Sequence, residues 1–216
     1  MRRRAALFAA TAGLLVLAGT AGGGGGSVTL SARPLTLPAA ISPQYEGLIL
    51  SGTVSSGQSN EDVTIQANEC TFPGWHDVVG AHTEGGGVYR VTFGAQSRTA
   101  FRAKWKGAVS RPITVRTRPG LNIEQLGRRL WSVGMLAQRS FLDRRGRLQR
   151  FDRRTSRWVT VKSFRFTEKF SVPAGSWTYA RFRARVPRGA QVRAYVPNSE
   201  IKPCYLAAYS VILKAR

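Results

Sequence analysis

The sequence predicts an all-β protein with two β-sandwich domains in tandem behind a signal peptide. Three observations point to this fold. Short apolar runs separated by Gly, Pro, Asn and Ser recur over residues 27–216, and no helical periodicity is evident there. The two halves of this region also resemble each other. Apolar residues make up 43% of the chain, including five Trp, six Tyr and ten Phe, which is enough for packed cores.

Residues 1–21 are predicted to be an export signal. Three arginines at positions 2 to 4 precede an apolar segment, Ala5–Ala18. Its 14 residues are too few to span a hydrocarbon layer of roughly 30 Å as a helix. Gly19-Thr20-Ala21 offers the small residues that signal peptidase reads, and Thr20 stands where a lipobox would need a cysteine. We therefore expect a secreted protein without lipid or membrane span, beginning with a flexible Gly-rich leader at 22–26.

The first half, residues 27–118, is predicted to contain seven strands. They are Ser27–Leu37, Glu46–Val54, Asp62–Ala67, His76–Thr83, Gly87–Gly94, Thr99–Lys106 and Val109–Arg116. The segment RTRPG, Arg116 to Gly120, then marks a tight domain boundary, because its Pro and Gly interrupt regular structure.

The second half, residues 119–216, gives another seven strands. They are Leu121–Gln125, Leu130–Ala137, Arg147–Phe151, Trp158–Phe166, Thr178–Val186, Gln191–Val196 and Tyr209–Ala215. Seven short strands in about 90–100 residues is typical of an immunoglobulin-like (Ig-like) sandwich. Ile65 precedes Trp75 by ten residues, just as Leu148 precedes Trp158, so the halves read as copies.

The chain resembles secreted actinobacterial proteins built of tandem bacterial Ig-like, fibronectin-type-III-like domains. The resemblance covers residues 27–216 and rests on SGTVSS, VTIQANEC, TAFRAKWKGAVSRPITVRTRP and PCYLAAYS. It implies spacer, accessory or adhesive modules and brings no catalytic residue with it. One departure is that no cysteine pair brackets a Trp within one domain, as it does in antibody domains.

No catalytic or metal-binding residue is predicted. His76 and His82 are the only histidines, and their spacing on a strand separates them by roughly 20 Å, too far to share a metal. No GxSxG elbow is present, and a small sandwich rarely builds the cleft in which a glycosidase pairs two carboxylates. We expect no enzymatic activity and no cofactor, with a polysaccharide-active enzyme as the third-ranked alternative.

The two cysteines, Cys70 and Cys204, are predicted to form a disulfide. An even number of cysteines in an exported protein favours this, and only one pairing is possible. The bond would tie the two domains together. The alternative is two buried free thiols.

The positive charge lies in the second half. The formal net charge is +22, and residues 119–216 hold 21 basic and five acidic residues, whereas residues 22–118 hold nine and six. Of the 33 basic residues 27 are Arg, whose planar fork suits phosphate and carboxylate. A single-sign field of this density repels itself and favours an anionic partner; a solvated face that only maintains solubility is the alternative.

Strand alternation predicts which arginines face solvent. In TYARFRARV the small and apolar residues point inward, so Arg181, Arg183 and Arg185 point outward, and QVRAYV adds Arg193 to this outward stripe. The segment RRGRLQRFDRRTSRW is predicted to be a folded hairpin with a turn at Asp152 to Arg157. The candidate polyanion-binding residues are Arg144, Arg145, Arg147, Arg153, Arg154, Arg181, Arg183, Arg185 and Arg193.

Together these features predict a secreted, non-enzymatic binding or accessory protein, possible partners being teichoic acid and acidic polysaccharide of the cell envelope. The second domain alone should bind these polyanions. The alternative from another class is a structural spacer or an adhesin that binds another surface protein.

Overall fold

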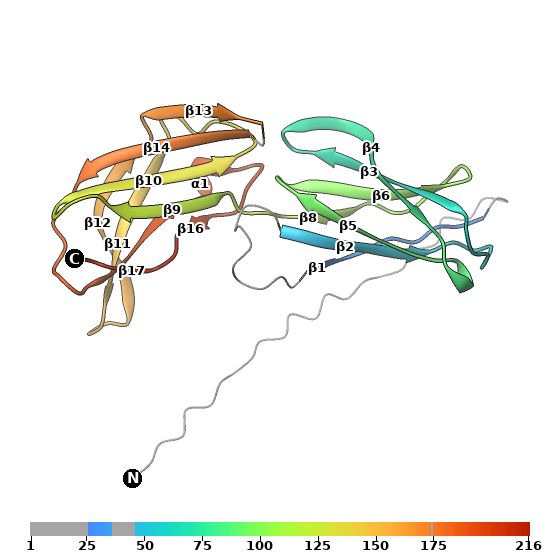
Figure 1. Cartoon of the computed structure of the whole chain (residues 1–216), viewed down its shortest axis with the longest axis horizontal. Coiled ribbons are helices and arrows are strands. Elements are labelled where there is room, and N and C mark those ends of the chain that lie inside the picture. Colours follow the sequence, from blue (N-terminus) through green and yellow to red (C-terminus); the bar gives the residue numbers. More distant parts are fainter. Residues whose placement is uncertain (1–25, 36–45, 174) are drawn as a thin grey trace, which may run out of the picture.

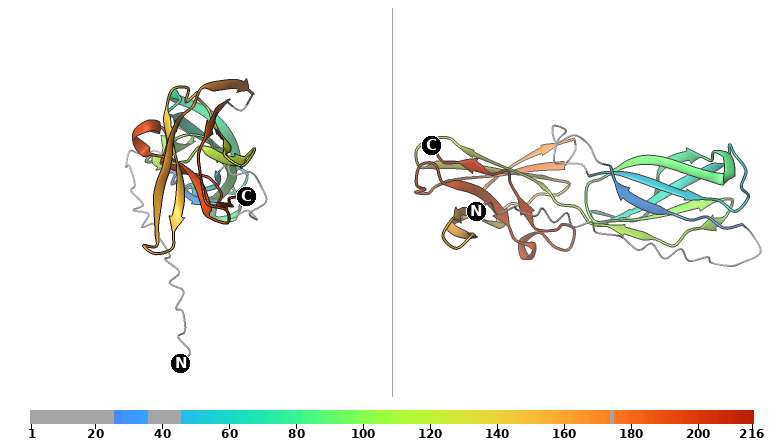
Figure 2. Two further views of the ribbon diagram at one scale, coloured as in Figure 1. Left: turned by 90° about the vertical axis from the view of Figure 1, so that its left-hand side faces the viewer. Right: turned by 90° about the horizontal axis from the view of Figure 1, so that it is seen from below.

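The computed structural model describes residues 26–35, 46–173 and 175–216. The predicted signal peptide and residues 22–25 of the leader lie outside the described residues. The predicted all-β sandwich fold is confirmed: two sandwiches of antiparallel strands lie end to end along the long axis (Figures 1 and 2). Among the described residues, no helix is both long and apolar enough to cross a membrane.

The first sandwich packs a three-stranded sheet on a five-stranded one. The first sheet has the order β1 (Ser31–Pro34), β2 (Glu46–Thr53), β5 (Val88–Ala95). The other has the order β4 (Phe72–His82), β3 (Asp62–Glu69), β6 (Thr99–Trp105), β7 (Ala108–Val109), and β8 (Ile113–Val115) also pairs with β6. A 3₁₀ turn, Gly85–Gly87, precedes β5. Leu50, Ile65 and Phe101 from the two sheets meet in one fully buried core.

The second sandwich repeats this plan with a larger first sheet. Its order is β13 (Glu168–Val172), β14 (Gly175–Arg183), β10 (Leu130–Ala137), β9 (Gly120–Gln125). The facing sheet has the order β12 (Arg157–Arg165), β11 (Arg145–Asp152), β15 (Gln191–Val196), β16 (Ala208–Tyr209), and β17 (Leu213–Lys214) also pairs with β15. A short helix, α1 (Asn198–Ile201), follows β15. The predicted alternation is confirmed, since Ala180, Val192, Ala194 and Val196 are fully buried.

The last strand of each sandwich differs from its prediction in the same way. Both are split in two by a serine. The Ser110 hydroxyl accepts the Ala103 N–H (2.9 Å), and the Ser210 hydroxyl accepts the Ala194 N–H (2.8 Å). In each case a side-chain oxygen replaces a backbone carbonyl as the acceptor in the hydrogen-bond ladder between strands. The strand is interrupted at that serine. β13 was also not predicted, because its exposed edge sequence EKFSV lacks apolar alternation.

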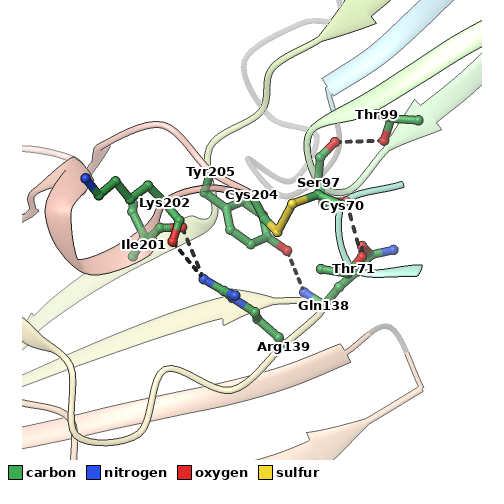
Figure 3. Close-up of a disulfide and its surroundings, with 10 residues drawn as sticks. All are labelled: Cys70, Thr71, Ser97, Thr99, Gln138, Arg139, Ile201, Lys202, Cys204 and Tyr205. Atoms are coloured by element: carbon green, nitrogen blue, oxygen red, sulfur yellow. Dashed lines mark hydrogen bonds between the residues drawn. A yellow bond between two sulfur atoms is a disulfide. The ribbon is translucent and has the colours of Figure 1, made fainter. Parts of the chain in front are cut away.

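A disulfide joins the sandwiches, as predicted. Cys70 follows β3 and Cys204 lies in the loop after α1, with their Cα atoms 5.3 Å apart (Figure 3). Cys204 is 3% exposed, and Cys70 packs against the core of the second sandwich. The covalent link therefore runs through a largely buried contact.

Hydrogen bonds surround the disulfide on both sides. The Arg98 N–H donates to the Cys204 carbonyl (2.8 Å), and Thr71 donates its hydroxyl to Gln138 of the second sandwich. The Gln138 N–H in turn donates to the buried Tyr205 hydroxyl (3.1 Å), as Figure 3 shows. Burial raises the pKa of Tyr205, so this phenol stays neutral. The junction therefore has several independent polar contacts besides the covalent bond.

Candidate functional site

The positive charge of the second sandwich is almost uncompensated by acidic side chains. Among the described residues three pairs of basic and acidic side chains lie within 4.0 Å, and two of them, His82–Asp62 and Lys106–Glu61, belong to the first sandwich. The third is Arg165–Asp143 at 3.6 Å, between exposed groups. Most arginines of the second sandwich therefore have no acidic partner within the described residues.

The few acidic residues of the second sandwich are partly occupied by the backbone. Asp152 accepts the Arg154 N–H (3.0 Å) and the Thr155 hydroxyl (3.0 Å), which form the β11–β12 turn. The Arg154 N–H, and then the Thr155 hydroxyl, hold the pKa of Asp152 below its usual value. Glu200 accepts the backbone N–H of Arg145 (3.1 Å). These carboxylates stabilise loops rather than neutralise guanidinium groups.

The nine predicted arginines are spread over several surfaces. Arg144 precedes β11, and Arg145 and Arg147 lie exposed on β11. Arg153 and Arg154 are exposed in the β11–β12 turn, at the other end of a strand about 23 Å long. Arg181 and Arg183 are exposed on β14, and Arg185 follows that strand.

The predicted outward stripe that joined Arg193 to Arg181, Arg183 and Arg185 is wrong. β14 pairs with β10, whereas β15 pairs with β11, so consecutive strands belong to opposite sheets. The chain crosses between the sheets over residues 184–190. Local alternation correctly orients each side chain relative to its own sheet, but it cannot tell which sheet a strand joins.

The Arg193 guanidinium makes contacts within the protein rather than extending freely into solvent. Its guanidinium lies between two rings, 4.2 Å from the Trp158 centroid and 4.5 Å from the Tyr209 centroid. Its Nε donates to Gln149 Oε1 (3.0 Å). Burial lowers its pKa, although an arginine remains charged. These two cation–π contacts and the bond to Gln149 engage the group within the protein, so we assign it a structural role rather than anion binding.

The first sandwich contains the same arrangement at the corresponding positions. The Arg102 guanidinium lies 4.2 Å from the Trp75 centroid, and its Nε donates to Gln66 Oε1 (2.8 Å). We call each set a Gln-Arg-Trp triad: Gln66, Arg102 and Trp75 in one sandwich, Gln149, Arg193 and Trp158 in the other. Because the triad occurs in both the weakly basic first sandwich and the strongly basic second one, we attribute it to the fold and not to anion binding.

Five arginines come together at the end of the second sandwich away from the junction. A hollow of about 910 Å³ there is lined by Arg128 and Arg129 from the β9–β10 turn and by Arg185 and Arg188 from the β14–β15 loop. Arg216 and the apolar Leu126, Val186 and Pro187 complete most of its wall. We call this hollow the basic pole. Among the described residues, no Asp or Glu lines it.

A second hollow of about 490 Å³ adjoins the basic pole. Arg188 lines both, and Arg150, Arg153 and Asp152 line the second. Sequence reasoning selected Arg153 and Arg185 but missed Arg128, Arg129, Arg150, Arg188 and Arg216. No local signal pointed to Arg128, Arg129 and Arg188. They come together because β10 pairs antiparallel with β14, which places the residues before one strand beside those after the other.

The two histidines lie on the first sandwich. His82 Nδ1 is 2.9 Å from Asp62 Oδ1 at an exposed site, and His76 packs edge-on to Phe72. Among the described residues, no three His, Cys, Asp or Glu side chains gather as metal ligands would.

No protein-family model and no curated protein matches this chain. A solved structure titled "Biofilm associated protein - BSP domain" is similar to it at 9% identity, with a TM-score of 0.26. The match covers 77% of this chain and 27% of that one, so this chain spans about a quarter of its length. A TM-score of this size does not establish a common fold.

Proposed function

We propose that this is a secreted, non-enzymatic, two-domain Ig-like protein whose second sandwich binds polyanions of the cell envelope, such as teichoic acid or acidic polysaccharide. One observation carries the proposal: 21 basic residues lie in residues 119–216, and Arg165–Asp143 is the one pair with an acidic side chain there among the described residues. Charge of this density is costly to hold together, and an external anion relieves the repulsion.

Strand order supports the Ig-like part of the proposal. In the first sandwich β1, β2 and β5 share one sheet, and β3, β4 and β6 share the other. In the second sandwich β9, β10 and β14 share one sheet with β13 at its edge, and β11, β12 and β15 share the other. This distribution of strands resembles that of Ig-like domains. The order β13-β14-β10-β9 corresponds to the four-stranded sheet of the constant type, while β12 is an additional strand in the facing sheet. A disulfide between the sandwiches fits a protein that works outside the cell.

The test is the salt dependence of binding by the whole secreted chain. Retention on immobilised teichoic acid should weaken linearly on a log–log plot against salt, because bound cations are released from the polymer. Changing Arg181, Arg183 and Arg185 to Gln should lower the slope by about two to three units, since each lost phosphate contact removes roughly one.

The matched control changes three exposed basic residues of the first sandwich, Arg90, Lys104 and Arg111, to Gln. This variant carries the same total charge and should keep the full slope. Equal effects of the two variants, or binding that is indifferent to salt, would rule out the proposal.

A second candidate function is a rigid spacer or protein-binding adhesin, which the disulfide-linked junction favours. A spacer needs stiffness but no ligand. It would be the better description if the whole chain showed no salt-sensitive retention on any envelope polyanion.

A further inference from the structure

We propose that the basic pole is a phosphate-binding site that takes several neighbouring phosphate groups of a linear polymer. This inference rests on the proposed polyanion function and assigns it a place and a ligand chemistry. Four of the side chains that would bind, Arg128, Arg129, Arg185 and Arg188, are exposed at one hollow.

The backbone that carries these arginines is fixed. The Leu126 N–H donates to the Leu130 carbonyl (2.9 Å), which closes the β9–β10 turn. The Ala184 N–H donates to the Arg129 carbonyl (2.9 Å), which ties this turn to the segment before Arg185. The Gly189 N–H donates to the Ala215 carbonyl (2.8 Å) on the other side of Arg188. The site therefore orders only side chains on binding, which keeps the entropic cost low.

The arrangement favours phosphate over carboxylate. A carboxylate carries a single negative charge on two oxygens that lie in one plane. A phosphate group presents oxygens in several directions, so it can accept from forks on two different loops at once. The β9–β10 turn and the β14–β15 loop supply such forks from two sides of the hollow. Leu126, Val186 and Pro187 make part of the wall apolar, which strengthens charged hydrogen bonds locally.

The size and shape of the pole favour a chain over a single ion or a membrane. About 910 Å³ falls in the range of ligand sites that hold several groups. The smaller hollow that shares Arg188 continues the positive surface toward Arg150 and Arg153. A linear polymer can follow this path, whereas a flat bilayer reaches only the rim of a hollow.

The test uses the whole chain and a short probe that fits the pole alone. Tripolyphosphate binding is measured by calorimetry at about 0.15 M salt, where charges more than about 8 Å apart are screened. The pole variant changes Arg128, Arg129, Arg185 and Arg188 to Gln. We expect it to bind at least about 100-fold more weakly, since each charge-assisted hydrogen bond contributes roughly tenfold or more.

A matched control changes Arg157, Lys162, Lys169 and Lys202 to Gln, which are exposed, lie outside the pole and are not among the candidate binding residues. This variant has the same net charge and should bind tripolyphosphate within about threefold of the parent chain. Equal losses in both variants would overturn the site but leave a diffuse polyanion-binding surface, and the proposed function, in place.

Two further arms test the ligand class. Citrate carries several carboxylates and should bind far more weakly; equal affinity for citrate and tripolyphosphate would overturn the phosphate assignment. Phosphatidylglycerol vesicles present phosphate on a membrane, and binding to vesicles without binding to tripolyphosphate would replace the polymer by a lipid surface. If the parent chain binds neither these probes nor teichoic acid, the proposed function fails together with the inference.

Discussion

Equivalent ends of the two sandwiches have different uses. In the first, the loop after β3 carries Cys70 and the loop before β6 carries Arg98, and both contact the second sandwich. β11 and β15 hold the corresponding places in the second sandwich. There the loop after β11 carries Arg153 and Arg154, and the loop before β15 carries Arg185 and Arg188.

The difference shows which features belong to the fold and which to the function. The Gln-Arg-Trp triads and the strand-splitting serines occur in both sandwiches, so the fold requires them. The disulfide occurs at this end of the first sandwich only, and the group of arginines at the equivalent end of the second sandwich only. One end is covered by a neighbour that is covalently attached, and the other presents charge to solvent.

Of the changes that test this comparison, removing the disulfide should have the largest effect on stability. Changing both Cys70 and Cys204 to Ala should lower the free energy of unfolding by about 4–5 kcal/mol, because the bond closes a loop of 134 residues in the unfolded chain. Urea titration of the parent and variant measures this. A loss below about 1 kcal/mol would mean that the polar contacts of the junction already hold the sandwiches together.

The triads should differ in strength between the sandwiches. Changing Arg193 to Ala removes two cation–π contacts and a hydrogen bond, at a cost of about 2–3 kcal/mol. Changing Arg102 to Ala removes one such contact and a hydrogen bond, and should cost about 1–2 kcal/mol. Chemical denaturation of the two variants gives the comparison.

The Arg193→Ala variant also tests whether this arginine takes part in binding or only stabilises the fold. Arg193→Ala should bind tripolyphosphate as tightly as the parent chain, within about twofold. A loss of binding comparable to that of the pole variant would return Arg193 to the binding surface.

The two serines should have equal and smaller effects. Changing Ser110 or Ser210 to Ala leaves the N–H of Ala103 or Ala194 without its acceptor inside the protein. Each change should cost about 1–2 kcal/mol, the usual penalty for an unsatisfied buried donor. Thermal unfolding of both variants checks this, with Ser140→Ala at an exposed loop position as the control. A clear difference between the stability losses of the Ser110 and Ser210 variants would show that the last strands of the two sandwiches are not equivalent.

Much of the fold could be predicted from the sequence because its signals are local. Strand alternation in TYARFRARV and QVRAYV oriented each side chain correctly, and the turn residues at Asp152 to Arg157 placed the β11–β12 hairpin. The Cys70–Cys204 bond followed from the even number of cysteines in a chain predicted to be exported. The split last strands did not follow, because one serine hydroxyl decides them through a contact with another strand.

The candidate site was harder to predict, because it depends on which strands share a sheet. Arg193 looked like its neighbours in sequence, yet Trp158 and Tyr209 enclose it from other strands. Arg128 and Arg188 are 60 positions apart and meet only because β10 pairs with β14. Linear order hides both facts.

The serine-split last strands also affect how copies of this protein behave at high concentration. β7 and β8, and likewise β16 and β17, form the open edge of their sheets beside β6 and β15. An unbroken edge strand offers a row of free N–H and C=O groups on which another molecule can add its own strand. Each edge here is divided into pieces of two or three residues, too short to template such growth. The interruption thus makes this edge of each five-stranded sheet a poor template for edge-to-edge aggregation.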